Sequence, residues 1–254
     1  GIGAKPMKTK SYIAAGKHPV AGLYGSLASL VCSGASLQWY RNNFLREDFE
    51  EMDREAEKRE DVDLCFYPYL AGAAYPVWNP KAKGAFTGIT LAHDRFDFAR
   101  AIMEGVAFGV RRGLEDFADN GCKVRRLIIV GGAARSRVWC QMISDITDTP
   151  VIRLNRTDIC AVGAGMIAAC GLGWYDGYED AAKACMNQKK RTCSIMRKSM
   201  QNSKACGTAS RSIMKEQPYK LIKGEFSMRY DYFHYTRLDR KFYEEHLKYR
   251  IPHE

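Results

Sequence analysis

The chain has 254 residues, of which 46% are hydrophobic and 27% charged, so it falls in the globular range and is long enough for one large domain or two small ones. No apolar run approaches the roughly 18 to 20 residues that cross a bilayer. The first residues, GIGAKPMKTK, lack the apolar stretch of a signal peptide. We therefore expect a cytoplasmic protein with no membrane partner.

The net charge of +10 is concentrated in the last quarter of the chain. Residues 1–185 carry 23 Lys and Arg against 22 Asp and Glu, whereas residues 186–254 carry 16 against 7. The nine cysteines form no C-x-x-C pair and no cluster at zinc spacing, so we expect reduced, mostly buried thiols and no metal site formed by the protein.

The first third of the chain predicts a strand followed by two helices. Residues 22–29 suggest a short strand, and residues 33–45 have apolar side chains at helical spacing after a candidate Ser cap. In residues 46–61, charges of both signs recur at i,i+3 and i,i+4, which predicts a solvent-exposed helix and no catalytic carboxylate pair.

The middle of the chain predicts an ordered loop and then the strongest helix. Residues 65–90 are dense in Gly, Pro and aromatic residues, which is typical of ordered loops and short strands. Residues 97–121 keep apolar side chains at helical spacing up to Gly121, which can end a helix. Within it, Arg100 and Glu104 are expected to form a structural i,i+4 ion pair.

Residues 126–146 read RLIIVGGAARSRVWCQMISDI and place two glycines between a strand and a helix. RLIIV is typical of a strand covered on both faces, and the residues from Ser136 repeat at helical spacing. A helix N-terminus offers free N–H groups, and glycines let ligand atoms approach the backbone, so this junction could receive a nucleotide. The alternative is that the Gly pair only forms a tight turn, because neither G-x-G-x-x-G nor a Walker lysine motif is present.

A second strand–helix unit follows, with a short strand at residues 150–154 and a helix of small residues at 158–174. Two such units in series favour an α/β fold. We expect residues 187–225 to form a basic, flexible connector and residues 226–254 to hold a C-terminal helix docked on the domain. Binding of single-stranded nucleic acid by the basic and aromatic residues of that last segment is the less favoured alternative.

Three segments in this order resemble the C-terminal domain of the FGGY family of carbohydrate kinases. They are residues 67–108, residues 128–151 and residues 161–174. Ten residues fit the second signature of that family at its spacing: Gly84, Phe86, Gly88, Ile89, Asp97, Phe98, Ala101, Ile102, Met103 and Glu104. The resemblance runs from about Tyr12 to Met186 and is greatest to xylulokinases and related pentulose kinases.

The resemblance implies a ribonuclease H-like domain of the actin-like ATPase type, with a mixed sheet and helices on both faces, over residues 1–186. It also implies the nucleotide-binding half of an enzyme that transfers the γ-phosphoryl group of ATP, with Mg²⁺, to a pentulose or polyol. Carried over by residue, Gly131, Gly132 and Ala133 touch the nucleotide. Arg135 and Ser136 lie beside the adenosine, and Gly72 lies in a loop near the same pocket.

The sugar, in this family, binds chiefly to a first domain that the sequence does not contain, so the resemblance assigns no catalytic residue here. The D-x-G-T-like hairpin and the G-x-x-D-x-x-A-like segment with the catalytic Asp are both missing, and we expect the chain alone to be inactive. A non-catalytic nucleotide-binding or regulatory module with the same fold stays open as the alternative. The sequence also leaves a homodimer open.

Overall fold

The computed structural model describes residues 1–7, 12–59, 62–153, 158–186 and 194–196. The predicted connector at 187–225 lies outside them except for one short strand, and the predicted helix at 226–254 lies wholly outside. In the described residues, no helix combines the length and apolar character needed to cross a bilayer.

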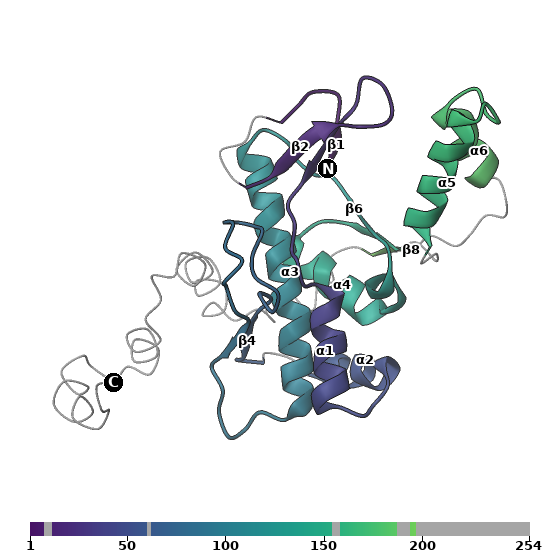
Figure 1. Ribbon diagram of the computed structural model, residues 1–254. Coiled ribbons are helices and arrows are strands. Elements are labelled where there is room, and N and C mark those ends of the chain that lie inside the picture. The colour runs from purple at the N-terminus through teal and green to yellow at the C-terminus, as the bar shows by residue number, and fades with distance from the viewer. Residues whose placement is uncertain (8–11, 60–61, 154–157, 187–193, 197–254) are drawn as a thin grey trace.

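Three strands at the beginning of the chain form an antiparallel sheet in the order β1–β3–β2. They are β1 (Ile2–Gly3), β2 (Ala14–Lys17) and β3 (Tyr24–Leu27). A small cluster beneath them contains Ile13 and Phe117. This sheet thus lies near the C-terminal end of α3 (Arg95–Asp119), the longest helix of the described residues (Figure 1).

The two predicted helices after this sheet are present as α1 (Gly34–Phe44) and α2 (Phe49–Lys58). Ser33 precedes α1 as expected, but its side chain makes no capping hydrogen bond. Asp48 does cap α2, since its carboxylate accepts the Glu51 amide proton at 2.8 Å. The helix α2 is not exposed all round, because it buries Met52 and Ala56.

The helix α3 (Arg95–Asp119) is the centre of the fold, and α1 runs beside it (Figure 1). It begins with a capping box, in which Asp94 accepts the Asp97 amide proton and Asp97 accepts that of Asp94. It ends at Asp119, and Gly121, just after the C-cap Asn120, has a φ of 79° that is readily adopted only by glycine. Its buried face packs on the strand β4 (Cys65–Tyr67), which pairs with β5 (Ala85–Thr87).

The two strand–helix units form the third sheet, in the order β6–β7–β8. β6 (Leu127–Ile129) runs parallel to β7 (Val151–Arg153), and β8 (Ser194–Met196) is antiparallel to β7. The predicted α/β fold with a mixed sheet is therefore confirmed.

Between β6 and β7 lie a single 3₁₀ turn, η1 (Gly132–Arg135), and the helix α4 (Arg137–Thr147). The helix α4 packs on α3, and both contribute to the main core. The helices α5 (Ile159–Gly171) and α6 (Tyr178–Met186) pack on each other and stand apart from α3 (Figure 1). The sequence predicted helical spacing from Ser136 onward, which agrees with Ser136 as the N-cap of α4, but it did not predict the 3₁₀ turn before it.

Candidate functional site

The two adjacent glycines lie where β6 ends and the chain turns toward α4. Gly131 has φ 78° and ψ −155°, a conformation that side chains with a Cβ rarely adopt. Gly132 then begins η1. The amide of Ala134 donates to the Gly131 carbonyl at 3.2 Å, which closes the turn. We refer to residues 131–136 as the glycine turn.

Open space surrounds both glycines. A Cβ built at Gly131 or at Gly132 would meet no heavy atom within 4 Å. Gly132 is exposed and has no positive φ, so it could accept a side chain without strain in the protein itself. The first amides of a helical turn lack an intrahelical acceptor, so the N–H groups of Gly132 and Ala133 suit an anionic ligand.

The glycine turn rests on a rigid base formed by α4. The indole N–H of Trp139 donates to the Met103 carbonyl on α3 at 2.9 Å, and both residues are buried. Cys140 is fully buried, and its thiol donates to the Ala133 carbonyl at 3.4 Å. Burial raises the pKa of Cys140 to about 11, so this thiol stays protonated and acts as a structural donor.

Ser136 connects the glycine turn to α2. As the N-cap of α4, its hydroxyl oxygen accepts the Trp139 amide proton at 2.9 Å. The same hydroxyl donates to the Asp53 carboxylate at 2.8 Å. Asp53 is half-buried, and the sequence analysis missed it because the surrounding charges indicated an exposed helix. Its position next to the buried Met52 is the only signal that could have found it.

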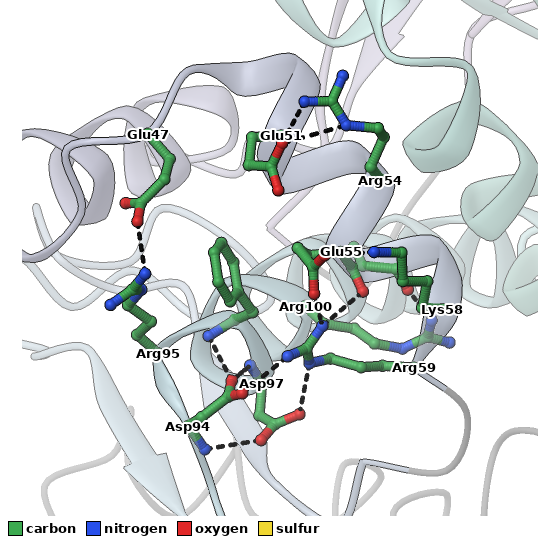
Figure 2. Close-up of polar contacts among 12 residues, drawn as sticks. Glu47, Glu51, Arg54, Glu55, Lys58, Arg59, Asp94, Arg95, Asp97 and Arg100 are labelled. Atoms are coloured by element: carbon green, nitrogen blue, oxygen red, sulfur yellow. Dashed lines mark hydrogen bonds and ion pairs between the residues drawn. The ribbon is translucent and has the colours of Figure 1, made fainter.

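An ion-pair network holds α2 against the beginning of α3 (Figure 2). The guanidinium of Arg59 contacts three carboxylates: Glu55 at 2.6 Å, Asp94 at 2.7 Å and Asp97 at 3.1 Å. Arg59 is only 19% exposed, so these pairs are screened less than free surface pairs. The network fixes the helix that carries Asp53.

The Arg100–Glu104 pair is present, with Nε and Oε1 2.7 Å apart. Arg100 also donates to the Ala56 carbonyl, which ties α3 to α2. The expected i,i+4 ion pair is confirmed.

The structure brings five of the six predicted site residues together in the glycine turn. Ala133 is half-buried on the main core, Arg135 is exposed, and Ser136 points to Asp53. Gly72 lies in a different segment, the loop between β4 and β5, and its place near the same pocket stays a prediction. Its φ is 82°, and a Cβ there would meet the Pro80 carbonyl oxygen at 2.8 Å, so Gly72 is needed for the loop itself.

The loop that contains Gly72 has its own apolar cluster, which includes Tyr67 and Tyr69 and is separate from the core under the glycine turn. Within the described part of the chain, no three His, Cys, Asp or Glu side chains gather in a way that could hold a metal ion.

Comparison with known proteins supports the α/β fold described above. The chain is 36% identical to the xylulose kinase of Bacillus subtilis over 156 residues, which cover 60% of this chain and 31% of that protein. The crystal structure of xylulose kinase from Rhodospirillum rubrum superposes with a TM-score of 0.66 at 26% identity, covering 92% of this chain and 45% of that one.

The structure of Plasmodium falciparum glycerol kinase with ADP superposes with a TM-score of 0.64 at 21% identity, covering 86% of this chain and 43% of the kinase. This likeness bears on the fold alone, which is the actin-like, ribonuclease H-like fold of the sugar kinases. The chain spans about a third of the length of the curated relatives that it matches. Residues 7–172 match the C-terminal domain of the FGGY family of carbohydrate kinases, and the chain therefore belongs to that family.

Proposed function

We propose that this chain is the nucleotide-binding part of an ATP-dependent sugar kinase that phosphorylates a pentulose, such as xylulose, or a polyol. Membership of the FGGY family supports the reaction class. The names of curated relatives, xylulose kinase in Bacillus subtilis and glycerol kinase in Agathobacter rectalis, support the acceptor class.

The observation that carries the nucleotide site is the open space in front of Gly131 and Gly132. Glycine has no side chain, and no other protein atom fills the space in front of these two residues, so a ligand could lie directly against the backbone. In the proposal, the amides of Gly132 and Ala133 donate to the nucleotide, and Arg135 and Ser136 lie beside its adenosine part. Gly72 shapes a neighbouring loop.

ATP with Mg²⁺ would supply the phosphoryl group and neutralise its charge. The residues of this chain bind and orient: the glycine turn meets the nucleotide, and α4 fixes the turn through Trp139 and Cys140. The parts of the protein outside this chain would hold the sugar and the carboxylate that accepts the proton of its hydroxyl. A cytoplasmic location belongs to the proposal as well.

Isothermal titration of the full 254-residue chain with ADP tests the nucleotide site. We expect saturable binding with one ADP per chain. The absence of heat of binding at millimolar ADP, in a chain that circular dichroism shows to be folded, would contradict the proposal.

A further inference from the structure

Two segments 83 residues apart meet at a single side-chain hydrogen bond, between Asp53 Oδ1 and Ser136 Oγ. Asp53 lies in the middle of α2, and Ser136 is the last residue of the glycine turn and the N-cap of α4. The helix α2 is in turn held by the Arg59 network (Figure 2). The bond therefore connects the glycine turn to a fixed point outside its own strand–helix unit.

The hydrogen-bonding capacity of the Ser136 hydroxyl explains what this bond does. A serine hydroxyl has one proton to donate and two lone pairs that accept. The proton goes to Asp53, and one lone pair accepts the Trp139 amide proton at 2.9 Å. The rotamer of Ser136 and the direction of its hydroxyl are thus both determined, and with them the point at which the glycine turn becomes α4.

We propose that Asp53 is a positioning residue for nucleotide binding: by accepting the hydroxyl proton of Ser136, it holds the glycine turn in the conformation that meets the nucleotide. This inference rests on the proposed function. Asp53 acts through Ser136 and does not itself touch the nucleotide.

The negative charge of Asp53 is not needed for its hydrogen bond with Ser136, and the surroundings of Asp53 disfavour that charge. Burial raises the pKa of Asp53, the bond from Ser136 opposes this shift, and the carboxylates of Glu57 and Glu50 on the same helix add to it. Cys140 on α4 lies close enough to Asp53 for the two to interact electrostatically. A neutral acceptor in the same place would keep the bond to Ser136 without the cost of burying a charge. Asparagine is such an acceptor.

The experiment measures ADP affinity of the full chain by isothermal titration for Asp53→Ala and Asp53→Asn. We expect Asp53→Ala to weaken ADP binding about fivefold or more, because a hydrogen bond to a charged group is lost. Asp53→Asn should bind ADP within about twofold of the wild type, because its amide oxygen still accepts the Ser136 proton.

The direction of the effect distinguishes positioning from charge. ADP is an anion, so loss of a nearby carboxylate would strengthen its binding through Coulomb interaction alone. Weaker binding in Asp53→Ala therefore cannot come from charge. Glu57→Ala is the matched control, since it removes an exposed carboxylate from the same helix and leaves the bond to Ser136 intact. It should not weaken ADP binding.

Ser136→Ala breaks the same bond from the other side and serves if Asp53→Ala fails to fold, because Trp139 still ties α4 to Met103. It should weaken ADP binding to a similar degree. Amide hydrogen exchange at Trp139 reports the order of the turn directly and should speed up in Asp53→Ala but not in Asp53→Asn.

Wild-type affinity in folded Asp53→Ala or Ser136→Ala, with an ADP-binding wild type, overturns the role of Asp53 alone. A wild type that binds no ADP overturns the proposed function, and the role of Asp53 falls with it.

Discussion

Gly105 on α3 lies so close to the carbonyl oxygen of Phe66 on β4 that a Cβ at this position would overlap it. The helix and the strand therefore approach each other at the distance that only glycine allows. Phe66 and the neighbours of Gly105 belong to the main core, which cannot easily give way. This contact determines how α3, and with it the base of the glycine turn, is placed on β4.

Replacement of Gly105 by alanine should destabilise the protein by about 1–2 kcal/mol, since overpacking a core outweighs the gain of about 1 kcal/mol that alanine normally brings to a helix. Chemical denaturation measures the free energy of unfolding. Gly165→Ala in α5 is the control, because a Cβ there meets nothing within 4 Å. It should be neutral or stabilising, and a stabilising Gly105→Ala would contradict the close approach.

Gly132→Val should weaken ADP binding at least about tenfold, or about 1.4 kcal/mol, because the side chain fills the space proposed for the nucleotide. The protein should stay folded, since that space is empty of protein atoms and Gly132 has no positive φ. Gly16→Val, at an exposed position of β2 with equally open space, should bind ADP like the wild type. Unchanged ADP affinity in folded Gly132→Val would rule out this site.

The raised pKa of Asp53 predicts a pH-dependent difference between the wild type and Asp53→Asn. The folded protein binds a proton at Asp53 more tightly than the unfolded chain does. Below the ordinary pKa of 3.8 the resulting stabilisation is complete, and it is lost as pH rises through the raised folded pKa. Asparagine does not titrate, so Asp53→Asn should be the more stable protein near neutral pH.

Thermal unfolding across pH 3 to 7 checks this prediction, and the difference in Tm between the two proteins should shrink on acidification. Other acidic groups titrate in both proteins, so they cancel in the difference. Ser136→Ala removes the hydrogen bond that lowers the pKa of Asp53, so Asp53 should titrate at higher pH in this variant. A Tm difference that grows toward acid pH would contradict the assigned direction of the shift.

Local patterns predicted most of the fold, because each element depends on short-range chemistry. The apolar spacing and Gly121 were enough to place α3, and the glycine pair was enough to place the junction after β6. The 3₁₀ turn was missed because the choice between 3₁₀ and α depends on how Ala133 and Cys140 pack on the core. That core is formed by elements far apart in the sequence, so no short-range pattern encodes the packing.

The candidate site was predictable only where it is local. The glycine turn is one continuous segment, so the junction could be located from the sequence pattern, and the resemblance then named five of its residues. The bond between Asp53 and Ser136 crosses 83 residues, and the charges around Asp53 are typical of an exposed helix. Gly72 was also named by resemblance; its φ of 82° and the Pro80 backbone, which a Cβ there would meet, explain why the loop needs a glycine, and its place near the nucleotide stays a prediction.

The final prediction is that the 254-residue chain, even with nucleotide bound, does not phosphorylate a sugar by itself. Phosphoryl transfer needs a positioned nucleotide, a metal that neutralises its phosphates, and an oriented hydroxyl next to a carboxylate that accepts its proton. The chain spans 31% of the length of the Bacillus subtilis relative, and the resemblance assigns the phosphate hairpin and the catalytic Asp to the remainder. A nucleotide on the glycine turn alone would face water and have no aligned acceptor.

A coupled assay of ADP release with xylulose, ribulose, glycerol and a blank without sugar should therefore show the same signal in all four. The same assay on a chain extended to the length of the relatives is the control, and it should respond to one of the sugars. Turnover by the 254-residue chain that rises with one sugar and disappears when that sugar is withdrawn would show that these residues already contain a complete catalytic site.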